Sequence, residues 1–376
     1  EVVLPEPSMY TDWTAVILLL HVGIALLDSV HVMPPGQPGA DGAREPRSLL
    51  DLALTPLRTR TETSYSAPFA LTAFDRETRL QPDGTQRREF PRLAHGGAHL
   101  AEQAERATDV SWRAACGALG GGTVALLASL LLWPGLRRSR EDRAALAAAA
   151  TLCVAGVLAG ALGALALRYH VFGTDKVGTD VLYQSLKSVR TGLVIGTLTT
   201  LITLPFALVL GVAAGYWRGL VDDVVQYLYT TLASIPGVLL VAASALLLDA
   251  AMTRHAEAFT SLVVRADLRL LALCAIRGIT SWTGLCRLLR AEALKLRESE
   301  FVHAAQALGV RGGTILRRHL LPNVMHIVII ATVLDFSGLV LAEAALTYID
   351  IGVDPGMESW GNMINAARME LARQPA

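Results

Sequence analysis

The chain of 376 residues contains seven apolar runs, each long enough to cross a lipid bilayer. A membrane-crossing helix needs about 20 consecutive apolar residues, because the hydrocarbon core is about 30 Å thick. Hydrophobic residues make up 52% of the chain and charged residues only 18%, which agrees with a membrane protein. We therefore expect an all-α membrane protein, with spans near residues 13–33, 112–133, 144–168, 190–215, 225–250, 268–289 and 323–347.

The distribution of basic residues predicts how these spans are oriented. Cytoplasmic loops of membrane proteins carry an excess of Lys and Arg. Two basic clusters therefore mark the cytoplasmic side: Arg137, Arg138, Arg140 and Arg143 in the first, and Arg287, Arg290, Lys295, Arg297, Arg311, Arg317 and Arg318 in the second. Four crossings separate the two clusters, so they agree with each other. Residues 34–111, 173–180 and the tail after Ile351 are then expected outside.

The first run lacks a basic flank ahead of it, and the residues His31 to Pro35 that follow it make a poor cleavage site. We interpret residues 1–33 as a retained N-terminal transmembrane helix. The segment 34–111 is rich in Pro, Gly, Arg and Thr, and its turn sequence from Gln81 to Thr85 predicts a small hairpin. Two interpretations of this insertion stay open: a cap that meets a partner outside the membrane, or an insertion that the fold tolerates.

A polar island from Glu298 to Asn323 separates the last two apolar runs. Its helix formers predict a short helix over 301–308, which Gly309 ends in the left-handed conformation. Ala304, Ala305, Ala307 and Leu308 are expected to give this helix one flat, apolar side that a partner approaches closely. Pro322 suits the first turn of the next span, because a helix leaves that N–H without a partner. The island is therefore predicted to be a docking element.

The island resembles the signature of the membrane-spanning permease subunits of ATP-binding-cassette importers. That signature is Glu-Ala-Ala, three residues, Gly, nine residues, then Ile-x-Leu-Pro. Here it reads His303-Ala304-Ala305, Gly309, then His319-Leu320-Leu321-Pro322, with every spacing kept. His303 replaces the Glu and His319 the Ile, so no role of that carboxylate is carried over. The resemblance implies that the ATPase-coupling residues are Phe301, His303, Ala304, Ala305, Ala307, Leu308, Gly309 and Pro322.

Further blocks narrow the resemblance to dipeptide and oligopeptide permeases. Residues 173–182 resemble the Gly-Thr-Asp-x-x-Gly-Arg-Asp-Val-Leu segment of that branch, with Thr179 in place of Arg. Residues 211–222, 341–353 and 359–363 match later blocks in order, so the resemblance covers about 173–370. It implies the type I importer permease fold, with extra N-terminal transmembrane helices and a periplasmic insertion. The expected domains are 1–33, 34–111, 112–168 with two helices, and a core permease domain over 169–376 that contains the cytoplasmic coupling helix.

Members of this branch carry one more helix after the segment that corresponds to Trp360-Gly361-Asn362-Met363. The sequence ends at Ala376 without another apolar run, and we interpret this as a truncated or unresolved C-terminus that lacks the final helix.

The sequence contains no Gly-x4-Gly-Lys-Ser/Thr phosphate loop and no hydrolase or metalloprotease motif, so we expect neither an enzyme nor a cofactor or metal site in this chain. The resemblance implies that cytosolic ATPase subunits bind ATP and Mg, that a second permease subunit completes the pathway, and that an external binding protein delivers cargo. The zero net charge argues against nucleic acid as a partner. Cys116, Cys153, Cys274 and Cys286 are interpreted as buried small hydrophobes.

These observations predict a permease subunit of an ATP-driven peptide importer in the bacterial inner membrane. One alternative is the same machine with another cargo, such as a nickel chelate or a peptide antibiotic. A second is a membrane scaffold without transport, and a third is an intramembrane enzyme.

Two charges fall within apolar runs, Arg277 and Asp335. Each lies about 12 residues from the cytoplasmic end of its span, so both are expected about 18 Å deep. A lone charge near the bilayer centre costs roughly 2.5 to 3.5 kcal/mol, which favours pairing or a water-lined cavity. We interpret the two as an intramembrane ion pair that locks two helices, while a role in the substrate path and unrelated partners stay open.

Overall fold

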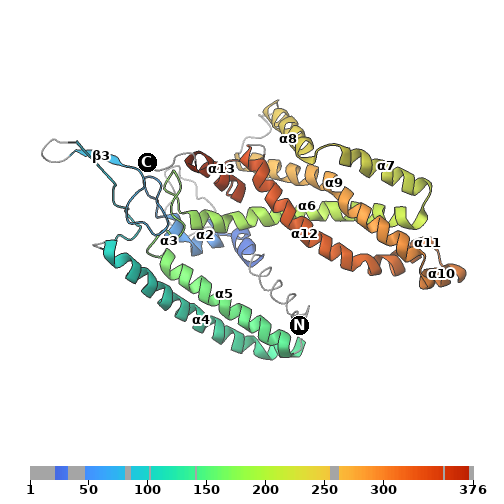
Figure 1. Cartoon of the computed structure of the whole chain (residues 1–376), viewed down its shortest axis with the longest axis horizontal. Helices are drawn as coiled ribbons and strands as arrows, with labels where there is room; N and C mark the ends of the chain where they lie inside the picture. Colours follow the sequence, from blue (N-terminus) through green and yellow to red (C-terminus); the bar gives the residue numbers. More distant parts are fainter. Residues whose placement is uncertain are drawn as a thin grey trace, which may run out of the picture. The chain divides into compact units, whose positions relative to one another are not determined.

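The computed structural model describes residues 22–32, 47–80, 86–100, 103–139, 142–254, 262–349 and 352–371. Figure 1 shows a chain built mainly of helices, and its short strands belong to the first hundred residues of the sequence. The chain divides into two compact units, residues 1–190 and 191–376. Helix α6 (Val181–Trp217) begins in the first unit and continues into the second.

Two long helices, α4 (Arg106–Ser139) and α5 (Asp142–Ala166), form a helical hairpin in the first unit (Figure 1). Glycines allow their backbones to touch. A Cβ on Gly121 would lie 2.1 Å from the carbonyl oxygen of Gly156, and a Cβ on Gly160 would lie 2.2 Å from that of Gly117. Small residues at such positions are how helices associate in membranes, where no hydrophobic effect drives them together.

The insertion of the first unit is a set of short elements around a small core. Its strands form two antiparallel pairs, β1 (His31–Val32) with β2 (Arg47–Ser48) and β3 (Glu77–Leu80) with β4 (Gln86–Glu89). The helical elements are α2 (Leu49–Ala53), α3 (Thr55–Arg58) and the 3-10 turn η1 (Gln103–Glu105). The predicted hairpin is confirmed by the pairing of β3 with β4, while its turn, 81–85, lies outside the described residues.

The second unit contains the remaining helices, and Figure 1 shows α6, α9 and α12 as its longest elements. They are α7 (Leu220–Ser234), α8 (Gly237–Arg254), α9 (Leu262–Arg297), α10 (Glu300–Ala307), α11 (Gly312–Ile315), a π-helical turn (Leu316–Leu320), α12 (Leu321–Tyr348) and α13 (Trp360–Leu371). Close approach of α6 to α9 builds its core: a Cβ on Gly215 would lie 2.5 Å from that of Ala293. Leu289 and Val324 are completely buried beside this contact.

The single span expected at 225–250 is wrong, because the chain breaks there into α7 and α8. Ile235 is extended, with φ −90° and ψ 127°, and Pro236 follows it. Proline has no N–H to donate and disfavours the helical conformation of the residue before it, so the helix ends at this point. Only the second part, Gly237–Arg254, is long and apolar enough to cross a membrane.

Five helices of the described residues are long and apolar enough to span a membrane: 103–133, 145–166, 181–217, 237–254 and 312–348. Helix α9 has the length, but its many charged residues lower its mean hydropathy. The first predicted span, 13–33, lies mostly outside the described residues, of which 22–29 are helical. All four cysteines were expected to be buried. Cys274 and Cys286 are buried as predicted, but Cys116 is exposed on α4 and Cys153 is half-buried, so the prediction is wrong for these two.

Candidate functional site

The short helix of the polar island, α10 (Glu300–Ala307), ends as its sequence predicts. Gly309 takes a left-handed φ of +73°. Its N–H donates to the carbonyl of Gln306 (2.9 Å), and the N–H of Val310 donates to that of Ala305 (3.1 Å). This pair of bonds is the Schellman motif, which caps the free carbonyls at the end of a helix. The prediction of a short helix closed by Gly309 is confirmed, with each boundary one residue earlier than expected.

The two faces of α10 differ in exposure. Val302 and Ala305 point inward and are 0% and 6% exposed, among the buried residues of the second unit. The prediction that Ala305 shares the accessible flat side with Ala304, Ala307 and Leu308 is therefore wrong. Phe301, Ala304 and Leu308 are apolar and exposed, and Leu308 is 83% exposed. Their spacing of three and four residues places them on one face, and we call them the docking stripe. His303 and Ala307 are exposed beside it.

A nearly continuous helical segment connects α10 to the long helix α12. Residues Gly312–Leu320 form α11 and the π turn, and Pro322 follows in the first turn of α12 as predicted. The side-chain amide of Asn323 donates to the carbonyl of His319 (2.6 Å), four residues earlier. The rings of His319 and Phe301 lie 6.4 Å apart, so the π turn and α10 are neighbours.

Ion pairs join the turn after α6 to the start of the polar island. Arg218 and Glu298 lie 2.8 Å apart, and Nε2 of His303 lies 3.8 Å from the same Glu298. Arg290 of α9 donates to Asp222 of α7 at 2.7 Å. This bond draws the pKa of Asp222 down, although burial opposes it. The buried side chains of Val302 and Ala305 attach α10 to the rest of the second unit, while the exposed contacts of Glu298 add little.

Arg277 and Asp335, which the sequence analysis expected at equal depth, both line one cavity. The cavity has a volume of about 260 Å³ and is lined by Thr200, Thr203, Leu204, Arg277, Ser281, Leu285, Thr332, Leu334, Asp335, Gly338 and Leu339. Among the described residues, no ion pair joins the two charges, and Nε of Arg277 is buried without a hydrogen-bond partner. The helix-locking pair stays a prediction.

Arg277 also borders a second, much smaller cavity of about 20 Å³, together with Glu343 of α12. Glu343 is 6% exposed and accepts a hydrogen bond from the hydroxyl of Thr347 (2.8 Å). The sequence analysis did not place this carboxylate near Arg277, because eight residues separate Glu343 from Asp335 along α12.

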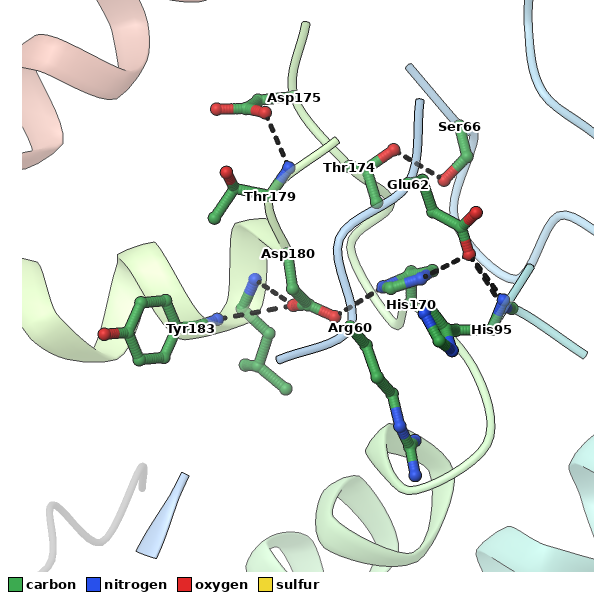
Figure 2. A network of polar contacts seen from close by, with 12 residues as sticks. Arg60, Glu62, Ser66, His95, His170, Thr174, Asp175, Thr179, Asp180 and Tyr183 are labelled. Atoms are coloured by element: carbon green, nitrogen blue, oxygen red, sulfur yellow. Dashed lines mark hydrogen bonds and ion pairs between the residues drawn. The ribbon is translucent and has the colours of Figure 1, made fainter. Parts of the chain in front are cut away.

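Residues 173–182 take part in a buried polar network in the first unit (Figure 2). Asp180 caps the start of α6 by accepting the N–H of Leu182 (2.8 Å). Its other oxygen lies 2.7 Å from Nδ1 of His170, whose Nε2 lies 3.3 Å from Glu62. Glu62 also accepts the backbone N–H groups of Ala94, His95 and Gly96 at 2.7 to 3.1 Å. The sequence analysis missed Glu62 and His170, which are 108 residues apart and form no local motif.

Electrostatics keep this network charged. Burial pushes the pKa of His170 down, but the hydrogen bonds and charges of Asp180 and Glu62 outweigh it and raise the pKa to about 9. Burial pushes the pKa of Glu62 up, but the hydrogen bond from His170 and those from the backbone N–H groups lower it to about 2. At neutral pH the imidazolium therefore lies between two carboxylates.

Glycine at position 178 allows the loop before α6 to pack onto the insertion. Gly178 has a φ of +78°, and a Cβ there would lie only 1.9 Å from the carbonyl oxygen of Glu62. The N–H of Glu62 donates to the carbonyl of Gly178 (2.9 Å). Asp175 accepts the N–H of Thr179 (2.8 Å), the residue that replaces the Arg of the resembled motif (Figure 2). The loop is thus hydrogen-bonded to Glu62 of the insertion and is also closed by its own bond between Thr179 and Asp175.

Residues 207–371 match the family of binding-protein-dependent transport system inner membrane components. The matching segment covers a little under half of the chain. It contains α10, all the residues that the sequence analysis assigned to coupling, and part of the lining of both cavities, including Arg277 and Asp335. The permease domain, together with the five apolar helices, makes the chain an inner-membrane protein.

Two curated relatives match a longer stretch of the chain than the family model does. The chain is 31% identical over 206 residues to the dipeptide transport system permease protein DppC of Lactococcus lactis, which covers 55% of each chain. It is 30% identical over 206 residues to the oligopeptide transport system permease protein OppC of Haemophilus influenzae, covering 54% of this chain and 60% of the relative. The chain thus spans a little over half the length of these relatives. The resemblance to dipeptide and oligopeptide permeases is confirmed.

Proposed function

We propose that this chain is a transmembrane permease subunit of an ATP-driven importer for dipeptides or oligopeptides. The single observation that carries the proposal is the docking stripe, an exposed apolar face on a helix whose other face is buried. A soluble end of a membrane protein seldom exposes a residue such as Leu308 without a partner to cover it. The similarity to dipeptide and oligopeptide permease proteins supports the substrate class.

In this proposal, the cytosolic ATPase subunits receive the docking stripe in a surface groove. These subunits bind the ATP and Mg, while this chain contributes no catalytic group. A second permease subunit completes the pathway through the membrane, and an external binding protein delivers the peptide. Residues 169–376 act as the core permease domain, with residues 1–33 and 112–168 as additional membrane helices and 34–111 as an external insertion.

The attachment of α10 explains how ATP-driven movement would reach the membrane. Only Glu298 and Ser299 separate α9 from α10, and the buried Val302 packs among residues of α9 and α12. Side-chain packing of this density transmits displacement instead of absorbing it. Movement of the ATPase subunits would therefore shift α10, α9 and the start of α12 together.

A charge placed on the docking stripe tests the proposal. Leu308→Asp adds a carboxylate to the exposed face and leaves the buried contacts of Val302 and Ala305 intact. Gln306→Asp is the matched control, because Gln306 is exposed on α10 but lies away from the stripe. We expect Leu308→Asp to reduce both the ATPase subunits that co-purify with the tagged chain and the uptake of labelled dialanine by at least tenfold. The control should retain both. Normal uptake and co-purification in Leu308→Asp would favour a scaffold and overturn the proposal.

A further inference from the structure

The cavity that Arg277 and Asp335 share lies near the middle of the membrane-spanning helices. Asp335 is about 20 Å from either end of α12 at 1.5 Å per residue. A volume of about 260 Å³ is room for about nine water molecules. At this depth no lipid headgroup reaches the cavity, because the hydrocarbon core of a bilayer is about 30 Å thick.

The exposure of Asp335 shows that the cavity opens at the surface of the second unit. Its neighbours Val333 and Leu334 are also exposed, at 61% and 68%, but they are apolar and suit a lipid or protein contact. A carboxylate facing lipid at this depth would cost roughly 2.5 to 3.5 kcal/mol or more, so such residues face a bundle interior or a water-filled path. The carboxylate of Asp335 is therefore expected to face the cavity and not the lipid.

Two polar groups around the cavity have no hydrogen-bond partner among the described residues. Nε of Arg277 and the hydroxyl of Thr200 are both buried without a hydrogen bond. An arginine stays charged at any physiological pH, and a buried polar group without a partner loses the free energy of its hydration. Among the described residues, neither Asp335 nor Glu343 forms an ion pair with Arg277, although each lines a cavity with it. The cavity is therefore lined by one positive and one negative group that form no ion pair with each other among the described residues, together with residues that carry hydroxyls.

We propose that this cavity binds the two charged ends of a short zwitterionic peptide. Asp335 receives the terminal ammonium group, and Arg277 receives the terminal carboxylate, which its planar guanidinium matches. Thr200, Thr203 and Ser281 line the same cavity and would border the peptide bond, although the hydroxyl of Thr203 already donates to the carbonyl of Gly278 (3.1 Å). This inference rests on the proposed function and adds to it a recognition site for free peptide termini within the membrane.

The test uses the complex purified from membranes through a tag on this chain, without the external binding protein. Equilibrium binding is measured for labelled dialanine, for N-acetyl-dialanine, which has no ammonium group, and for dialanine amide, which has no carboxylate. We expect saturable binding of dialanine and at least tenfold weaker binding of each analogue. Asp335→Asn should bind dialanine and N-acetyl-dialanine equally, and Arg277→Gln should bind dialanine and its amide equally. Each variant should still discriminate against the other analogue.

Arg287→Gln is the matched control, because it removes the same charge from α9 at a residue that does not line the cavity. It should bind all three probes as the native complex does. A helix-locking pair instead predicts that both variants lose assembly without any exchange of probe preference. Loss of assembly in both variants without a change in probe preference overturns the inference. So does equal binding of the three probes, or absence of dialanine binding up to 10 mM. The proposed function is tested separately, because it survives such an outcome if dipeptide uptake still depends on Leu308.

Discussion

Nδ1 of His170 lies 2.7 Å from Oδ2 of Asp180, and this contact links two residues of the loop that connects α5 to α6. Through its other nitrogen, the same imidazole meets Glu62, which holds the backbone of residues 94–96. The insertion is therefore packed onto the loop before the core helices by buried, charged hydrogen bonds. This attachment is compatible both with a cap that meets a partner and with a tolerated insertion.

Replacing His170 by Gln should reduce the stability of the insertion in a pH-dependent way. The pKa of His170 is raised to about 9 from 6.5, so its contribution is fully present below pH 6.5 and is lost as pH rises through 9. A shift of this size corresponds to about 3 kcal/mol. Thermal unfolding of the purified chain should therefore show a large difference between native and variant at pH 6 and a small one at pH 10. His95→Gln, at an exposed side chain, should show none. A difference that stays constant over this range would contradict the charged network.

Gly178→Ala should destabilise the loop before α6 by more than the backbone strain of a positive φ. Gly219 is the matched control, because it has a φ of +58° with no atom within 4 Å of an added Cβ. Alanine there should cost only backbone strain of roughly 1–3 kcal/mol, because a positive φ combined with a ψ of −133° suits glycine. At Gly178, the added Cβ also meets the carbonyl of Glu62 at 1.9 Å. Equal melting temperatures of the two variants would show that this contact is unimportant.

Gly121→Leu should separate α4 from α5. Its side chain would enter the backbone of Gly156, whereas Gly120 on the next position has open space around it. We expect Gly121→Leu to lower the melting temperature in detergent by several degrees and Gly120→Leu to leave it nearly unchanged, because backbone contact between membrane helices requires small residues. If both variants melt alike, the glycine contact does not hold the hairpin together.

Features that depend on neighbouring residues were predictable from the sequence. Gly309 ends α10 and Pro322 starts α12, because each acts on its own turn of helix. The break at Pro236 had an equally local signal, which the apolar run around it concealed. The inward direction of Ala305 also had a signal, since Val302 lies three residues before it and completes the buried face.

Features that depend on distant residues were not predictable in the same way. The sequence predicted equal depth for Arg277 and Asp335, and both line one cavity. Whether their side chains form an ion pair depends on the packing of α6, α9 and α12, which the sequence does not report. Glu62 and His170 meet only because the insertion folds onto the loop before α6. No periodicity or motif in the sequence reports such a contact.

The central claim is that the docking stripe of α10 contacts an ATPase subunit inside the cell. Site-specific photo-crosslinking in intact membranes tests it most directly, with p-benzoylphenylalanine placed at Leu308 and, as a control, at Gln306. The account predicts that the probe at Leu308 captures a nucleotide-binding subunit and that the probe at Gln306 captures it far less. Capture of no such subunit at Leu308, or labelling of this position by a membrane-impermeant reagent added outside the cell, would contradict it.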